Sequence, residues 1–292
     1  MVPGPTPPTV STDMQIIRDA PSMRRFTRLQ REAGRTVGFV PTMGALHAGH
    51  LELVRTAREL ADSVVLSIFV NPMQFNERSD FDRYPRDIDT DCALAAQAGV
   101  SAVYAPAQAT MYPDGFDTRV HVEATAAPLE GAGRPGHFDG VATVVTKLLN
   151  AVEPDVAVFG RKDYQQLAVV SRMARDLDMP VRIVGVDTVR EPDGLALSSR
   201  NVRLTPAARS AAPVIHRALT EARHALVSSA TPDETRRVFA GVMSAAPDAR
   251  IEYVSVADAD TLVELDHART PAVISCAVWF GDVRLIDNVL VP

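Results

Sequence analysis

Two histidines that directly follow a predicted strand are the side chains of this sequence most suited to chemistry on phosphates. His47 and His50 lie within residues 41–50 (PTMGALHAGH), between a predicted strand and a predicted helix. Residues three apart on a helical turn face the same way, and the start of a helix offers N–H groups to an anion. The segment therefore predicts a polyphosphate cradle, in which Gly44 lets the backbone approach the ligand closely. Taken alone, it also fits a tight turn with two capping or core histidines, or a two-histidine metal site.

Two further segments combine cations and hydroxyls in turns. Residues 159–166 (FGRKDYQQ) place Lys162 where a strand ends and a helix begins, so that its ammonium group can reach a phosphate. A solvated Lys162 beside a helix-capping Asp163 is the alternative. Residues 195–201 (LALSSRN) offer two adjacent hydroxyls and Arg200 on a loop, although serine pairs are also common in polar interdomain loops. Each of the three segments therefore offers groups that could bind phosphate oxygens.

One segment matches a nucleotide-binding motif in its residues but not in its predicted secondary structure. Residues 131–136 (GAGRPG) fit the G-x-G-x-x-G fingerprint, which requires a strand before it and a helix opening at it. The preceding residues 126–130 (AAPLE) do not resemble a strand, and Pro135 interrupts the run. We therefore expect a flexible loop there and no dinucleotide site of that type.

The elements that must position these segments follow an α/β pattern. Apolar runs predict buried strands at 36–40, 63–70, 102–104, 155–159 and 181–186, and helical spacing predicts helices over 51–61, 88–98, 141–152 and 164–177. Strands that alternate with helices predict a Rossmann-like, mostly parallel sheet. In such sheets ligands bind beyond the carboxyl ends of the strands, which is where the three segments lie.

The last third of the chain predicts a smaller α+β domain. Thr205 and Thr231 each precede a proline and predict helix starts, and Glu234 completes a capping box with Thr231. Strands are expected at 251–256, 272–280 and 283–290, the last two joined by a two-residue hairpin at 281–282. We therefore expect a Rossmann-like domain over 1–186, with a disordered tail over 1–12, and an α+β domain over 187–292.

Composition excludes several classes of function. The chain has 292 residues, 46% hydrophobic and 23% charged, with a formal net charge of −6. This acidic balance argues against a sequence-independent nucleic-acid binder. Its two cysteines, Cys92 and Cys276, lie far apart, which argues against a zinc cluster or a disulfide framework. Apolar runs are too short to span a membrane, and the N-terminus lacks the features of a signal peptide, so we expect a cytoplasmic protein.

The order of the three segments resembles a known superfamily. Residues 47–50 (HAGH) resemble the HxGH motif of nucleotidylyltransferases and class I aminoacyl-tRNA synthetases, and residues 197–200 (LSSR) resemble their KMSKS-type loop. More narrowly, the chain is similar to the pantothenate synthetase (pantoate–β-alanine ligase) family. That similarity rests on residues 41–47, 69–75 (FVNPMQF), 134–138 (RPGHF), 162–167 (KDYQQL) and 193–201 (DGLALSSRN).

The resemblance implies an activity and a set of site residues. The family joins D-pantoate to β-alanine through a pantoyl adenylate, using ATP and Mg²⁺, and implies a homodimer. Carried over, His47, His50 and Lys162 are catalytic, with His50 in an acid role, and Gln74 and Gln166 bind substrate. The implied ATP-binding residues are Met43, Gly44, His47, His50, Gly160, Lys162, Asp163, Val189, Leu197, Ser198, Ser199 and Arg200. Two positions depart from the family pattern: Arg161 replaces an acidic residue and Leu197 replaces a methionine.

Several alternatives stay open at this point. A nucleotidyltransferase of the same superfamily could act on another small substrate, although neutral Gln74 and Gln166 suit an unphosphorylated acid better than a phosphorylated one. A non-catalytic RNA-binding relative is disfavoured by the acidic charge. The acidic residues Asp87, Asp89 and Asp91 could contact Mg²⁺ or simply favour a helix N-terminus, so no metal ligand is assigned. Residues 76–85 predict either a mobile lid or an ordinary surface loop.

Overall fold

The computed structural model describes residues 14–292, so the predicted tail over 1–12 lies outside the described part. The chain packs as two compact units. The first holds the residues up to His121 together with Gly136–Phe159 and Val170–Val186, and the second holds Val122–Pro135, Gly160–Val169 and Asp187–Pro292. Two short segments, at 122–135 and 160–169, thus pack with the C-terminal part of the chain. The predicted two-domain division at residue 187 stays a prediction.

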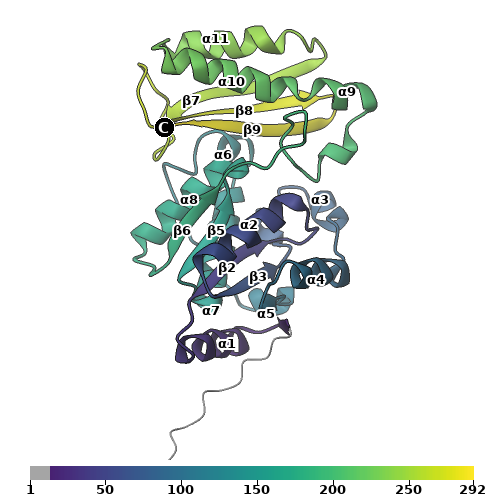
Figure 1. Cartoon of the computed structure of the whole chain (residues 1–292), viewed down its shortest axis with the longest axis vertical. Coiled ribbons are helices and arrows are strands. Elements are labelled where there is room, and N and C mark those ends of the chain that lie inside the picture. The colour runs from purple at the N-terminus through teal and green to yellow at the C-terminus, as the bar shows by residue number, and fades with distance from the viewer. Residues whose placement is uncertain (1–13) are drawn as a thin grey trace, which may run out of the picture. The chain divides into compact units, whose positions relative to one another are not determined.

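The first unit is built on a six-stranded sheet with the strand order β1-β4-β3-β2-β5-β6 (Figure 1). Its strands are β1 (Gln15–Ile17), β2 (Val37–Thr42), β3 (Ser63–Ile68), β4 (Ala102–Tyr104), β5 (Val156–Gly160) and β6 (Arg182–Val186). The pairings β1–β4, β4–β3, β3–β2 and β2–β5 are parallel. The predicted α/β class is confirmed, and the continuous apolar runs of β2 and β3 reflect burial on both faces.

Helices cover both faces of this sheet. They are α1 (Ala20–Glu32), α2 (Ala48–Leu60), α3 (Arg78–Arg83), α4 (Ile88–Gln97), α5 (Gln108–Met111), α7 (His137–Val152) and α8 (Tyr164–Asp176), which begins in the second unit. On one face, α2 and α4 pack against alternate strand residues, including Val40 and Leu66. On the other, α1 and α7 contact each other and β2. Because βαβ crossovers place helices on both faces, the carboxyl ends of the strands are left to the connecting turns.

The second unit contains a three-stranded antiparallel sheet in the order β7-β8-β9. Its strands are β7 (Ala249–Asp258), β8 (Ala272–Phe280) and β9 (Val283–Val291). The helices α9 (Pro206–Ala211) and α11 (Pro232–Met243) begin where Thr205 and Thr231 predict, and a third helix, α10 (Val214–Val227), was not predicted separately. Helices α10 and α11 pack on the sheet (Figure 1). Their common core includes Ile215, Leu219, Phe239 and Ile274. This is the small α+β arrangement that the sequence predicts.

Local structure differs from expectation in a few places. Helix α1 and strand β1 follow the proline-rich N-terminal segment directly and were not predicted. The G-x-G-x-x-G match carries one helical turn, α6 (Glu130–Gly133), where we expected a flexible loop, and the residues just before it form no strand. Within the candidate lid at 76–85, α3 is a short helix. Both cysteines are free and buried, as expected for structural thiols.

Candidate functional site

The turn between β2 and α2 is held by a buried carboxylate. Asp91 is 3% exposed, and its two oxygens accept the backbone N–H groups of Ala45 at 2.9 Å and Leu46 at 2.8 Å. Gly44 is required beside it: its φ is +84°, and a Cβ there would lie 2.6 Å from Asp91 Oδ2. Of the three acidic residues considered for Mg²⁺, Asp91 therefore anchors the turn, and Asp87 caps α4 by accepting the N–H of Thr90 at 3.0 Å.

The two histidines of the turn use the same ring nitrogen toward the backbone. His47 caps α2 and accepts the N–H of Gly49 at Nδ1, at 3.1 Å, while His50 Nδ1 accepts the N–H of His47 at 3.3 Å. A backbone N–H only donates, so Nδ1 of each ring is unprotonated, and a neutral ring carries its proton on Nε2. The ring centroids lie 4.1 Å apart. The histidines are thus capping residues, and each neutral ring also has an Nε2–H that can donate to an anion.

Gln74, the predicted substrate-binding glutamine of the first unit, has a defined amide orientation. Asn71 is fully buried and donates from Nδ2 to Gly140 O and to Gln74 Oε1, both at 3.0 Å. Because a carbonyl only accepts, Nδ2 of Asn71 must face Gly140, and Gln74 must face Asn71 with its oxygen. The Gln74 nitrogen then lies on the other side, 3.0 Å from the sulfur of Met43. The orientation presents N–H groups, which suit an acceptor such as a carboxylate.

Tyr112, which directly follows α5, and the start of α7 complete this network. Tyr112 donates its hydroxyl to Asn71 Oδ1 at 2.8 Å, and burial raises the pKa of Tyr112 above its usual value, so that it remains a donor. His137 Nδ1 lies 2.8 Å from the backbone oxygen of Gln74. Helix α7 approaches so closely that a Cβ on Gly140 would lie 2.3 Å from Met73 O. The motif at 69–75 therefore meets His137 and Gly140 of α7 in the first unit.

In the second unit, Lys162 lies in a single turn of 3-10 helix, Arg161–Asp163, directly after β5. Its side chain is 22% exposed, and Nζ is 3.8 Å from Asp163 Oδ1. The side chain of Arg161, one of the two departures from the family pattern, pairs with Asp187. The next two glutamines differ in role: Gln165 is buried and bonds Glu130 N, Thr125 O and Pro128 O, whereas Gln166 is only partly buried.

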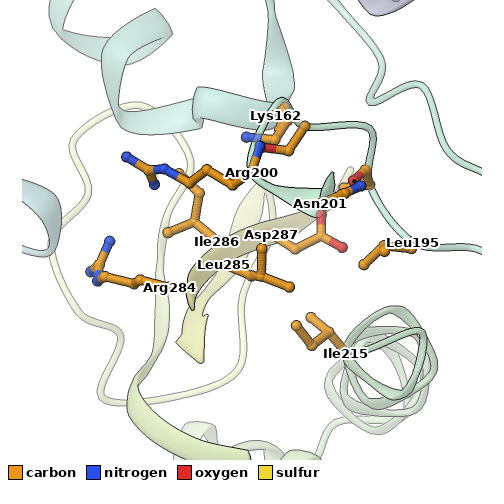
Figure 2. Close-up of a pocket in the computed structure, with 11 residues that line it drawn as sticks. Lys162, Leu195, Arg200, Asn201, Ile215, Arg284, Leu285, Ile286 and Asp287 are labelled. Atoms are coloured by element: carbon orange, nitrogen blue, oxygen red, sulfur yellow. Dashed lines mark hydrogen bonds between the residues drawn. The ribbon is translucent and has the colours of Figure 1, made fainter. Parts of the chain in front are cut away.

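The residues around the predicted KMSKS-type loop form a small hairpin. Leu197 N donates to Val189 O at 2.9 Å, and Arg190 pairs with Ala196 in an antiparallel bridge. The following turn is closed by Arg200 N, which donates to Ser198 Oγ at 3.2 Å. A pocket lies beside this turn. It is lined by Lys162, Leu195, Ala196, Ser198, Arg200, Asn201, Ile215, Arg284, Leu285, Ile286 and Asp287 (Figure 2).

A buried ionic cluster near this pocket was not predicted from the sequence. Arg284 donates to Glu130 at 2.7 and 2.8 Å and to Glu252 at 2.9 Å. Burial lowers the pKa of Arg284, but the hydrogen bonds with Glu252 and Glu130 outweigh it and raise that pKa above its usual value. Burial and the neighbouring Arg200 lower the pKa of Arg134, within the RPGHF motif. Three cations, Lys162, Arg200 and Arg284, thus line the pocket, together with the carboxylate of Asp287.

The predicted site residues fall into two groups, one in each unit. Met43, Gly44, His47, His50 and Gln74 lie in the first unit, and the structure brings Met43 and Gln74 into contact. Gly160, Lys162, Asp163, Gln166, Val189, Leu197, Ser198, Ser199 and Arg200 lie in the second, where Lys162, Ser198 and Arg200 line one pocket. Sequence reasoning missed the contacts that hold the first group: Asp91 accepts two N–H groups of the histidine turn, and Asn71, to which Tyr112 donates, orients Gln74.

Comparison with known proteins covers nearly the whole chain. A family model described as pantoate-beta-alanine ligase matches residues 15–290. The pantothenate synthetase of Moorella thermoacetica is 49% identical over 278 residues, which is 95% of this chain and 98% of the relative. That of Sphingopyxis alaskensis is 50% identical over 276 residues, 94% and 99% of the two chains.

Solved structures agree with the sequence comparison. The pantothenate synthetase of Thermus thermophilus superposes with a TM-score of 0.88 at 47% identity, covering 95% of this chain and 99% of that one. The pantoate-beta-alanine ligase of Francisella tularensis, complexed with beta-gamma ATP and beta-alanine, has a TM-score of 0.76 at 33% identity, covering 95% and 98%. Within residues 14–292, no helix combines the length and apolar character that crossing a bilayer requires.

Proposed function

Because the chain belongs to the pantoate–β-alanine ligase family, we propose that it joins D-pantoate to β-alanine at the expense of ATP, through a bound pantoyl adenylate. The observation that carries this function is the family match over residues 15–290, which includes both the histidine turn and the lysine turn. The products are pantothenate, AMP and pyrophosphate.

In the first step a carboxylate oxygen of pantoate attacks the α-phosphorus of ATP. The bond from that phosphorus to the bridging oxygen breaks, and pyrophosphate leaves with the electron pair. Two anions must approach each other, so positive charge and N–H donors are needed at the phosphates. A helix N-terminus contributes about 0.3–1 kcal/mol at exposed sites, whereas removing one preorganised donor to developing charge costs roughly 2.7–4 kcal/mol. Side-chain donors should therefore dominate.

We assign these donors to His47, His50 and Lys162. The Nε2–H of each neutral imidazole supports this role, because the opposite nitrogen is used to cap α2. His50 is the residue to which the family assigns an acid role. Ser198, Ser199 and Arg200 would bind phosphate oxygens, and the remaining nucleotide contacts are proposed for Met43, Gly44, Gly160, Asp163, Val189 and Leu197.

Two amides are proposed to orient pantoate. The contact with Asn71 turns the amide nitrogen of Gln74 away from Asn71, and we propose that this nitrogen donates to the acid. Of the adjacent glutamines, Gln165 is occupied by three backbone groups, which leaves Gln166 as the candidate ligand. An arginine would bind the carboxylate more strongly but would reduce its nucleophilicity, whereas a neutral amide orients it without neutralising its charge.

In the second step the amine of β-alanine attacks the acyl carbon of the adenylate. The bond from that carbon to the phosphate oxygen breaks, and AMP leaves with the electron pair. We propose that the phosphate of the adenylate accepts the amine proton. Acyl adenylates also react with water, so the site must exclude water while the amine arrives.

Mg²⁺ is proposed to enter with ATP. Among residues 14–292, no group of three or more His, Cys, Asp or Glu side chains could hold a metal ion. Mg²⁺ commonly binds through substrate phosphates with few protein ligands, and carried by the nucleotide it would neutralise phosphate charge. A homodimer and a cytoplasmic location are also proposed, and light scattering and cell fractionation would test them.

ATP–pyrophosphate exchange tests the proposed function directly. Purified protein should exchange labelled pyrophosphate into ATP when D-pantoate and Mg²⁺ are present and β-alanine is omitted, because the adenylate forms before the amine arrives. Leaving out D-pantoate or Mg²⁺ is the control and should abolish exchange. With β-alanine added, pantothenate and AMP should appear in equal amounts. A stable nucleotidylated product, or no exchange with D-pantoate, would contradict the assignment and favour a nucleotidyltransferase acting on another substrate.

A further inference from the structure

Asn288, in β9, hydrogen-bonds the backbone of the turn that carries Lys162. Its Nδ2 donates to Arg161 O at 2.8 Å and to Lys162 O at 2.9 Å, and the residue is 7% exposed. Both partners are carbonyls and only accept, so the amide nitrogen must face the turn. An aspartate at this position could not donate, and a serine could donate only once. The two bonds therefore depend on an amide.

The preceding residue holds the other phosphate-binding segment of the second unit. Asp287 is 4% exposed and receives two hydrogen bonds from Arg190, at 2.6 and 3.0 Å. Arg190 also donates to Gly194 O at 3.1 Å, which closes the hairpin leading to Ser198. Successive side chains of a strand point to opposite faces. Asp287 therefore binds the hairpin from one face of β9, and Asn288 binds the lysine turn from the other.

We propose that Asn288 is a positioning residue for Lys162, an inference that rests on the function proposed above. Asn288 holds the two carbonyls of the turn and so sets where the Lys162 side chain begins, without itself contacting substrate. Lys162 lines the pocket together with Ser198, Arg200 and Asp287 (Figure 2). Strand β9 is then the common support of the phosphate-binding residues of the second unit.

The test is a double-mutant cycle on the adenylation step. Asn288→Ser keeps one donor without adding charge, and we expect it to lower the maximal rate of ATP–pyrophosphate exchange about tenfold, because a small misplacement of a reacting group can cost up to roughly 10²-fold. The KM for D-pantoate should stay within about twofold. In a Lys162→Ala background the same substitution should cost less than about twofold, because effects of residues that act through one another do not add. Asn288→Asp, which has no donor, should lose more than Asn288→Ser.

Ser275→Ala is the matched control. Ser275 is the strand partner of Asn288 on β8 and is 7% exposed, so its substitution removes a buried polar group at the same level of the sheet. It should leave exchange within about twofold of wild type, as expected when no special interaction is lost. Circular dichroism and the melting temperature report the folded fraction of each variant, to which rates are normalised.

Two results would overturn the inference. One is a folded Asn288→Ser protein with wild-type exchange; the other is an equal loss in the wild-type and Lys162→Ala backgrounds, which would indicate a general effect on the fold. Should Asn288→Asp not fold, Asn288→Ser still decides between these outcomes. Failure of the wild-type protein to exchange with D-pantoate would instead overturn the proposed function.

Discussion

Lysine is rare in this chain, which makes the choice of cation at position 162 informative. The sequence contains lysine only at positions 147 and 162, and the other residues of the Lys+Arg total of 30 are arginine. An ammonium group is a compact point charge, whereas the wider guanidinium fork suits bidentate partners. The compact ammonium group suits the role proposed for Lys162, which is to reach between phosphate oxygens.

Replacing Lys162 with alanine should therefore lower the rate of adenylation by roughly 10²-fold or more, because a preorganised donor to developing charge is lost. ATP–pyrophosphate exchange with D-pantoate measures this step alone. Lys147→Gln is the control: Lys147 lies over the ring of Phe116, 4.8 Å from its centroid, in the first unit. Near-normal exchange by Lys162→Ala would show that Lys162 is an ordinary solvated charge.

Among the elements, α11 shows how local sequence sets a helix boundary. Thr231 Oγ1 accepts the backbone N–H of Glu234 at 3.2 Å, and Glu234 Oε2 accepts the backbone N–H of Thr231 at 2.8 Å. The predicted capping box is therefore present. Phe239 and Met243 then place one face of the helix in the core of the second unit. Capping thus fixes where α11 begins, and packing holds the rest of the helix against the core.

Removing the cap should be a measurable but tolerable loss. Thr231→Ala is expected to destabilise the protein by about 1 kcal/mol, the usual cost of losing a threonine N-cap. The midpoint of urea unfolding measures it. Glu221→Ala, at an exposed position of α10, is the control and should change stability by less than about 0.5 kcal/mol. An unchanged midpoint in Thr231→Ala would mean that α11 is held by packing alone.

For the whole molecule, one half-buried histidine couples folding to pH. Burial, with a smaller effect of Arg190, lowers the pKa of His216 below its usual value. Within the described residues, its Nδ1 is buried without a hydrogen-bond partner. Between the unfolded pKa of about 6.5 and the lower folded pKa, the unfolded chain binds more protons, so acidification favours unfolding.

We expect the stability contributed by neutral His216 to be complete above about pH 6.5 and to be lost as the pH falls through the folded pKa. The urea midpoint should therefore fall less between pH 7.5 and 5.5 in His216→Gln than in wild type. His224→Gln, an exposed histidine of the same helix, is the control and should follow wild type. Identical pH dependence in all three proteins would contradict the role of His216.

Sequence alone determined much of the molecule's organisation, because periodicity and capping are local properties. The alternation of apolar runs and helical spacing predicted the parallel sheet, and Thr205 and Thr231 predicted where helices begin. Residue type, spacing and order also singled out the three segments for which we propose phosphate binding. Helix α1 buries Met23, Phe26, Thr27 and Gln30, and this face, in which two of the four residues are polar, was not recognised as that of a helix.

Only the tertiary structure decided which residues hold those segments in place. Asp91 lies 45 residues from the Leu46 amide that it accepts, and Asn288 lies 126 residues from the Lys162 carbonyl to which it donates. No local pattern distinguishes such an aspartate from a helix-capping acid, or such an asparagine from a surface amide. Their roles follow from how distant parts of the chain pack together, because a side chain can bond a backbone group only where the fold brings the two within about 3 Å.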